Sequence, residues 1–245
     1  MPKSSSPEPK RVAVFTDLDN CLFQSLHRMH TDSVRVATVT REGQPQAGMS
    51  AAQEQLWSLL QHADVLIPTT GRTEEQMRRV KLVFTGPSIC LQGALILDET
   101  GNADSHWWEM ILSQSLQLQR VLGNLEHTLT RRCDVLDVWV ESIVREGTIV
   151  FLKIRPKVRS ILPDWVEIKR AVADLLPQEW SPRIESTEML ILPPHVGKEY
   201  AVQHLIQQMS GGPLLTIGIG GGEADLPFMS SCHFSVRLED RAVAQ

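Results

Sequence analysis

The sequence predicts an α/β protein in which a parallel sheet covered by helices is interrupted by a second, α+β unit. Short apolar runs alternate with amphipathic helical stretches in residues 11–98, which is typical of a parallel sheet. From about residue 99 to 192, a long helical stretch precedes alternating, hairpin-like segments, and the first pattern returns from residue 193. We therefore expect a Rossmann-like core, 11–98 and 193–245, with residues 99–192 inserted as an α+β domain.

The expected elements follow from local patterns in chain order. Ser50 with Gln53, and Thr73 with Gln76, form Ser/Thr-x-x-Gln capping boxes that mark two helix starts. Residues 1–10, which are rich in Ser, Pro and charge, read as a disordered tail. The core elements are a strand at 11–16, a hairpin at 34–49 turning around "REGQP", a helix at 50–63, a strand at 64–70, a helix at 71–84, a helix at 198–209, a strand at 213–219 and a strand at 233–238. The inserted elements are a helix at 106–129, a hairpin at 135–156 turning at Arg145-Glu146-Gly147, a helix at 164–177 and one strand-like segment at 183–194.

The composition of the chain argues against several classes of protein. A chain of 245 residues with 42 % hydrophobic residues can build a proper core. A net charge of -5, from 29 acidic and 24 basic residues, gives no reason to expect nucleic acid as a partner. No apolar run approaches a membrane span, and the N-terminus lacks a secretory signal. The four cysteines form no C-x-x-C pair, which argues against a zinc site and a disulfide framework, so we expect a cytoplasmic protein.

A pair of carboxylates, Asp17 and Asp19, ends the first expected strand. Open α/β sheets place their ligands at the carboxyl ends of their strands. There, one carboxylate can act as a nucleophile or metal ligand while its neighbour moves protons. A calcium loop is excluded, because Cys21 and Leu22 occupy a ligand position and the glycine position, and Arg28 stands where the bidentate Glu is needed. A simple polar strand end is the structural alternative.

Three other segments carry candidate residues at element boundaries. In "TTGRT", Thr70 and Gly71 can present a hydroxyl and amides to a phosphoryl oxygen, or simply form a strand-to-helix turn. Lys198 begins a helix, where the dipole disfavours a cation, although a solvated surface lysine is the alternative. Asp225 lies within the glycine-rich stretch "GIGGGEADLPFM", just beyond the glycines. This stretch is not a dinucleotide-binding fingerprint, because Glu223 occupies the position of the third glycine.

Taken together, the four motifs resemble those of the haloacid dehalogenase superfamily of phosphatases. "FTDLDNCLF", "PTTGRTEEQM", "VGKEYAVQHL" and "GIGGGEADLPFM" are similar to its first to fourth motifs, and "CLQGALILDETG" is similar to the segment that leads into its cap. The match is to members with a large α/β cap between the second and third motifs, the group of sucrose-phosphate and mannosyl-3-phosphoglycerate phosphatases. The resemblance implies a magnesium-dependent hydrolase that acts on a small phosphorylated metabolite, such as a sugar phosphate or related phosphomonoester.

The resemblance also implies a role for each matching residue. Asp17 would attack phosphorus and form an aspartyl-phosphate, while Asp19 would protonate the leaving oxygen and then activate water. Thr70, Gly71 and Lys198 would bind the transferring phosphoryl group. Mg²⁺ would be held by Asp17, by the backbone carbonyl of Asp19 and by acids of the fourth motif. Such a site fits phosphoryl transfer, which depends mainly on positioning and charge neutralisation.

The fourth motif departs from the family pattern G-D-x-x-N-D. Gly221 stands in place of the usual metal-binding Asp, and Ala224 in place of the Asn. Three hypotheses follow: Asp225 together with Asp17 suffices for Mg²⁺, Glu223 replaces the missing acid, or the protein is a weak or inactive relative that binds a phosphorylated ligand. A phosphotransferase is a further alternative.

The inserted unit, expected to set substrate specificity, offers weaker signals. Alternating cations could receive a second anionic group or form a solvated face; they are Lys153, Arg155, Lys157 and Arg159. Large aromatics could stack on a sugar or form the core of the unit; they are Trp107, Trp108 and Trp139. His195, near Lys198, could reach a ligand or be an ordinary turn histidine.

Overall fold

The computed structural model describes residues 11–29, 33–158, 162–180, 182–185 and 187–238. The predicted tail 1–10 and Arg159 lie outside these residues. The chain divides into two compact units. The first comprises the chain up to Asn102, Lys198–Gly221 and the chain from Pro227; the second comprises Ala103–Gly197 and the turn Gly222–Leu226.

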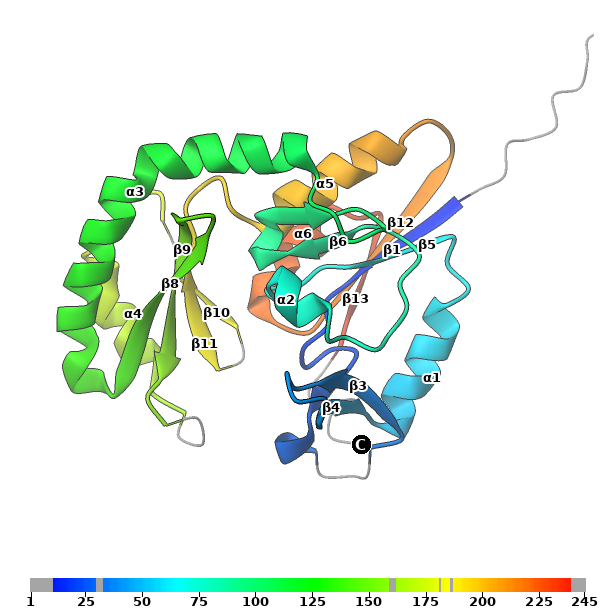
Figure 1. Ribbon diagram of the computed structural model, residues 1–245, viewed down its shortest axis with the longest axis horizontal. Coiled ribbons are helices and arrows are strands. Elements are labelled where there is room, and N and C mark those ends of the chain that lie inside the picture. The colour runs from blue at the N-terminus through cyan, green and yellow to red at the C-terminus, as the bar shows by residue number, and fades with distance from the viewer. Residues whose placement is uncertain (1–10, 30–32, 159–161, 181, 186, 239–245) are drawn as a thin grey trace, which may run out of the picture. The chain divides into compact units, whose positions relative to one another are not determined.

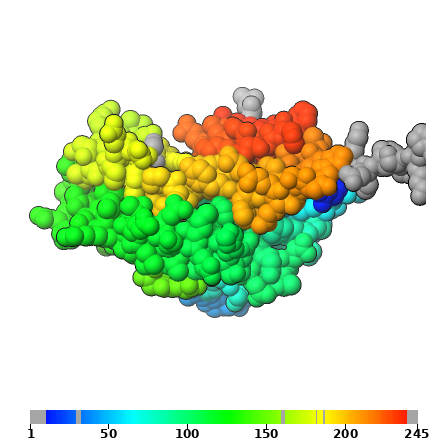
Figure 2. Space-filling view, turned by 90° about the horizontal axis from the view of Figure 1, so that it is seen from above, coloured from blue at the N-terminus to red at the C-terminus, as the bar shows by residue number. Residues whose placement is uncertain are grey.

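A parallel sheet forms the centre of the first unit, which confirms the predicted fold class. Its strand order is β13-β12-β1-β5, and each neighbouring pair is parallel. Thr16 pairs with Pro68 on one side and with Ile219 on the other, so the chains that follow these three strands leave the sheet at one edge. The strands are β1 (Arg11–Thr16), β5 (Val65–Pro68), β12 (Leu214–Gly220) and β13 (Phe234–Arg237). The edge strand β13 is exposed along its length, and its red segment lies on the surface in Figure 2.

Shorter elements surround this sheet. The predicted hairpin is present as β3 and β4, and both predicted capping boxes are formed. The bounds are β2 (Gln24–Ser25), η1 (Leu26–Arg28), β3 (Arg35–Val39), β4 (Pro45–Met49), α1 (Ala51–Leu60), α2 (Glu74–Met77), β6 (Ser88–Cys90), η2 (Leu91–Gly93), β7 (Leu95–Leu97), α5 (Lys198–Met209), η4 (Glu223–Asp225) and α6 (Leu226–Met229).

The helix predicted over 71–84 is wrong in length, because α2 ends at Met77. After it, the backbone bonds to the hairpin. The amide of Val39 donates to the Arg79 carbonyl over 3.2 Å, and the amide of Lys81 donates to the Ala37 carbonyl over 2.8 Å. These bonds use backbone groups that a longer helix would need for itself.

Gly218 in β12 packs against the helix α6. A Cβ at this position would lie 2.8 Å from Met229 Cα and 3.2 Å from Cys232 Sγ. We expect Gly218→Ala to lower the free energy of unfolding by about 1–3 kcal/mol, because backbone must move to admit the methyl group. Urea unfolding measures this change.

The matched control is Gly211→Ala, where an added Cβ meets nothing within 4 Å. If the two alanine variants unfolded at the same urea concentration, the close approach of β12 and α6 would not constrain the fold. Gly218, the first glycine of "GIGGGEADLPFM", is thus explained by its packing against α6 rather than by a ligand.

The second unit is an antiparallel sheet with two helices. Its strand order is β10-β11-β9-β8, and α3 and α4 lie along one face (Figure 1). Leu152, Ile154 and Ile191 of the sheet belong to the same buried cluster as Leu129 of α3 and Ile168 of α4. The bounds are α3 (Ser105–Cys133), η3 (Asp134–Leu136), β8 (Val138–Arg145), β9 (Thr148–Pro156), α4 (Trp165–Ala173), β10 (Pro182–Glu185) and β11 (Glu188–Ile191).

Two features of this unit refine the sequence prediction. The segment 183–194 is not one strand, since β10 and β11 form an antiparallel pair in which Arg183 lies opposite Leu190. Trp107 and Trp108 are buried, whereas Trp139 is half-exposed. Within the described part of the chain, no helix combines the length and the apolar character that a membrane span requires.

Candidate functional site

Asp17 and Lys198 form a buried ion pair at the carboxyl edge of the parallel sheet. Asp17 directly follows β1, and its amide donates to the Ile219 carbonyl over 2.8 Å. Lys198 is the first residue of α5, and its Nζ donates to Asp17 Oδ1 over 2.9 Å. The Lys198 and Asp17 side chains are 1 % and 8 % exposed. Lys198 is therefore not a solvated surface lysine, and a buried cation of this kind persists only when it is paired.

Asp19 lies in a different environment two residues later. Its side chain is 47 % exposed, and both of its oxygens accept from the Arg72 guanidinium. Arg72 Nε donates to Oδ2 and Nη2 donates to Oδ1, each over 2.7 Å. The first motif thus places one carboxylate in the interior against a lysine and the other at the surface in an arginine fork.

The loop after Asp19 is held from two directions. Asn20 has a left-handed backbone with φ of 56°, and its amide donates to the Phe23 carbonyl over 2.8 Å. Gln53, whose side chain also caps the amino end of α1, donates from Nε2 to the Cys21 carbonyl over 2.9 Å. Cys21 is fully buried, and the bond from Gln53 fixes the backbone of the loop at this residue.

Thr70 and Gly71 follow β5, next to the strand that carries Asp17. Thr70 is 1 % exposed, and its Oγ1 accepts from the Arg72 amide over 3.2 Å. As a hydroxyl it also has a hydrogen to donate. Its own amide donates to the Ile89 carbonyl over 2.9 Å, which fixes the turn.

The glycine-rich turn follows β12 at the same edge. A Cβ at Gly221 would lie 3.5 Å from the Asn20 carbonyl oxygen and 3.7 Å from that of Leu238, both ordinary contacts. Asp225 is 3 % exposed, and its Oδ2 accepts from the Gly222 amide over 3.1 Å. Glu223 is exposed. Of the two acids in this motif, Asp225 is the one held in a fixed, buried position.

Glu185 is a candidate that the sequence analysis missed. It ends β10, and one of its carboxylate oxygens lies within 4.8 Å of one from Asp225, in the same structural unit. Paired carboxylate oxygens are the ligands that Mg²⁺ prefers, so these residues fit that ion. The segment "RIEST" carries no motif that marks Glu185. Arg72 was also missed, although it stands in the third position of the quoted T-G-R.

The other candidates of the inserted unit have partners of their own. His195 Nε2 and Ser115 Oγ share a hydrogen bond of 2.9 Å, and burial lowers the pKa of His195 to about 4, so its imidazole is neutral at physiological pH. Lys153 pairs with Glu188 over 3.3 Å, and Arg155 pairs with Glu141 over 3.0 Å. Lys153 and Arg155 are therefore neutralised by acids on the same sheet.

The thiols of Cys90 and Cys232 lack the character of a nucleophile. Burial raises the pKa of Cys90 and of Cys232 to about 12. Thiolates rather than thiols attack and bind metals, so these cysteines are inert at neutral pH. The four cysteines of the chain, all within the described residues, are unbridged.

Comparison with known proteins identifies the fold. Neither a family model nor a curated protein matches the sequence. Among solved structures, the chain is similar to the sucrose-phosphatase of Synechocystis sp. PCC6803 in complex with sucrose and phosphate. The TM-score is 0.57 at 17 % identity, covering 92 % of this chain and 82 % of that one. The chain thus has the fold that its resemblance to haloacid dehalogenase-like phosphatases implies, a parallel-sheet core with an inserted cap.

Two further solved structures share this fold. The C-terminal domain of trehalose-6-phosphate phosphatase from C. albicans matches with a TM-score of 0.56 at 12 % identity, covering 91 % of this chain and 74 % of that one. N-terminally truncated, IMP-bound IMP-nucleotidase from Plasmodium falciparum matches with a TM-score of 0.58 at 9 % identity, covering 96 % and 68 %. At these identities the likeness establishes the fold, and the chemistry has to be argued from this chain's own residues.

Proposed function

We propose that the protein is a magnesium-dependent phosphatase that hydrolyses a small phosphorylated metabolite through an aspartyl-phosphate on Asp17. The observation that carries the proposal is the buried pair of Asp17 and Lys198 at the sheet edge, with Thr70 on the adjacent strand end. A carboxylate kept in the interior against a cation, where a phosphoryl group can meet both, suits attack on phosphorus.

The chemistry needs two displacements. A carboxylate oxygen of Asp17 forms a bond to phosphorus while the bond to the ester oxygen breaks, and Asp19 gives that oxygen a proton. Asp19 then takes a proton from water as the water attacks phosphorus, which releases phosphate and regenerates Asp17. Lys198 and the Thr70 hydroxyl, with the amide of Gly71, would hold the phosphoryl oxygens during both steps.

Asp17, the backbone carbonyl of Asp19 and Asp225 would hold Mg²⁺. The burial of Asp225 and the exposure of Glu223 favour Asp225 over Glu223 as the acid from the fourth motif. When bound, the ion supplies positive charge to the phosphoryl oxygens.

A sugar phosphate is the substrate class that we favour. The cations Lys153 and Arg155 are paired with acids, so they support a neutral, hydroxyl-rich leaving group better than a second anionic group. Two similar structures are of sucrose-phosphatase and trehalose-6-phosphate phosphatase, whose substrates are of this kind by name.

Phosphate release from a panel of sugar phosphates, nucleoside monophosphates and alkyl phosphates tests the proposal. We expect turnover that requires Mg²⁺ and stops with EDTA. No release by micromolar protein from any member would contradict it and favour the alternative of a weak or inactive relative that binds a phosphorylated ligand. Thermal unfolding with the same panel would detect such binding. An added alcohol that receives the phosphoryl group would instead indicate a phosphotransferase.

Gly221→Asp tests whether the altered fourth motif weakens the metal site. The new side chain has room, since its Cβ would make only ordinary contacts. We expect the Mg²⁺ concentration for half-maximal activity to fall about tenfold, because an added carboxylate provides a further oxygen ligand. A Mg²⁺ titration of phosphate release gives this value.

Gly211→Asp is the control for an added negative charge, because its side chain would point into open space. An unchanged Mg²⁺ requirement in Gly221→Asp would mean that the remaining acids already form a complete site.

A further inference from the structure

We propose that Arg72 is the positioning residue that orients Asp19 for proton transfer, and that it couples this group to the phosphoryl-binding turn. The proposal rests on the proposed function. It assigns a role to Arg72, the arginine of the second motif, which has no role in the two displacements proposed for Asp17 and Asp19.

The Arg72 side chain is fixed over its whole length. Its guanidinium lies over the Phe23 ring, with 5.1 Å from Cζ to the ring centroid, and the side chain is 14 % exposed. Phe23 is fully buried in the core cluster of the first unit. A guanidinium stacked on a fixed ring presents its donors in one direction, so the fork that reaches Asp19 is preorganised.

The backbone of Arg72 is held as well. Its amide donates to Thr70 Oγ1 over 3.2 Å, and its carbonyl accepts from the Leu91 amide over 2.9 Å. One residue therefore bonds the hydroxyl proposed to bind the phosphoryl group and the carboxylate proposed to move the proton. A displacement of Arg72 would disturb the distance between these two groups.

The backbone around Asp19 is held by its own hydrogen bonds, but its carboxylate reaches solvent and is oriented by the Arg72 fork. Its side chain is half-exposed and belongs to a loop that turns through a left-handed Asn20. A carboxylate on such a loop would otherwise sample several rotamers. Two parallel charge-assisted hydrogen bonds restrict the carboxylate to one plane, which fixes the direction in which it can exchange a proton with a leaving oxygen or a water.

The fork is directed at Asp19 alone. Nε and Nη2 of Arg72 donate to the two oxygens of this one carboxylate. Arg72 therefore acts on the orientation and proton transfer of Asp19 rather than on substrate binding. Its loss should affect substrates that need a proton on the leaving oxygen more than those that do not.

The test compares Arg72→Met with the parent on two substrates, through kcat/KM, which reports steps up to departure of the leaving group. The leaving group of glycerol phosphate is an alkoxide, which needs a proton. The leaving group of p-nitrophenyl phosphate is a stabilised phenolate, which does not. We expect kcat/KM to fall about 10–100-fold for glycerol phosphate and less than about threefold for p-nitrophenyl phosphate. Arg72→Lys, which keeps the charge but loses the fork, should recover only part of the loss.

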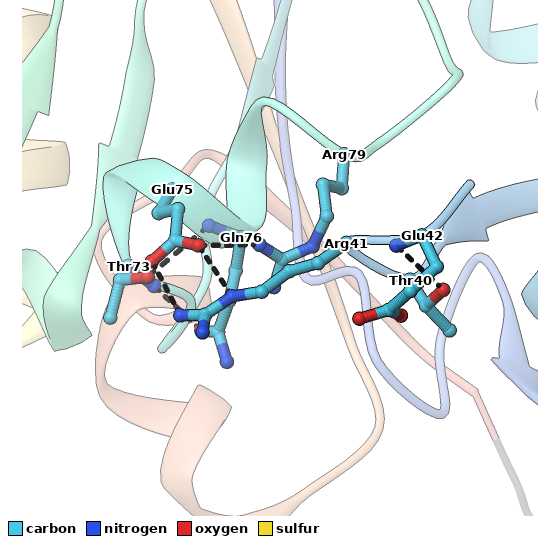
Figure 3. A network of polar contacts seen from close by, with 7 residues as sticks. All are labelled: Thr40, Arg41, Glu42, Thr73, Glu75, Gln76 and Arg79. Carbon is cyan, nitrogen blue, oxygen red and sulfur yellow. Dashed lines mark hydrogen bonds and ion pairs between the residues drawn. The ribbon is translucent and has the colours of Figure 1, made fainter. Parts of the chain in front are cut away.

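Arg41→Met is the matched control. Arg41 makes the same kind of fork to Glu75 on the surface, with Nε to Oε1 at 2.8 Å and Nη2 to Oε2 at 3.0 Å (Figure 3). Its loss should leave both kcat/KM values unchanged. If Arg72→Met lowered both substrates equally, Arg72 would be merely structural and the inference would be wrong. If the parent released phosphate from no substrate, the proposed function would fail and this inference with it.

Discussion

Asp17→Asn is expected to lower phosphate release by about 10⁴-fold or more, because an amide cannot form the aspartyl-phosphate. The substitution keeps the shape of the side chain and an oxygen that can accept from Lys198 Nζ, so the fold should survive. The free energy of unfolding should fall by about 1–3 kcal/mol, because the buried ammonium loses its charged acceptor. Phosphate release and urea unfolding of the same preparation measure both changes.

Asp64→Asn provides the control at the opposite end of β1. Asp64 accepts from the Val12 amide over 2.7 Å, near the opposite end of β1 from Asp17. Its amide variant should retain the parent's turnover. Phosphate release by Asp17→Asn at the parent's rate would eliminate the covalent mechanism.

Lys198→Met is expected to be the most destabilising of the proposed substitutions. Removal of the ammonium leaves Asp17 buried without its cation, which costs about 3–5 kcal/mol in pairs of this kind. Methionine is close in volume to the stem of lysine, so lost packing contributes little. Turnover should also be lost, because the transferring phosphoryl group would no longer meet a cation. Urea unfolding and phosphate release report the two effects.

The double variant Asp17→Asn/Lys198→Met separates charge from packing. If the cost of Lys198→Met comes from the unpaired carboxylate, neutralising Asp17 should restore part of the lost stability. An additive loss in the double variant, or a Lys198→Met variant as stable as the parent, would mean that the pair contributes no charge-dependent stability.

Local chemistry determined most of the core elements. Ser50 and Gln53 cap a helix wherever their segment lies, because the bonds of a capping box join residues three apart. The apolar run ending at Asp17 similarly reads as a strand from its own residues. The alternation that predicts the hairpin of β8 and β9 is also local, and so is its turn at Glu146 and Gly147. For the same reason, the division into a parallel sheet and an inserted antiparallel unit could be predicted without a structure.

Local sequence patterns gave wrong predictions where backbone hydrogen bonds between distant segments determine the structure. The helix α2 stops at Met77 because residues 79–81 bond to the hairpin strand β3. A Thr-x-x-Gln box marks where a helix begins but does not specify how far it continues. The hairpin of β10 and β11 was likewise hidden in a short segment that reads as one strand.

Only the tertiary structure determined the burial of the candidate residues and the partners that they bond. Asp17 and Lys198 are 181 positions apart, and Asp19 and Arg72 are 53 apart. The motifs determine which residue types are present, whereas the register of β1 with β5 and β12 brings the strand ends to one edge. Burial of Lys198 and the fork on Asp19 depend on that register and on where α5 begins. Both are set by packing of the whole sheet, which no local pattern records.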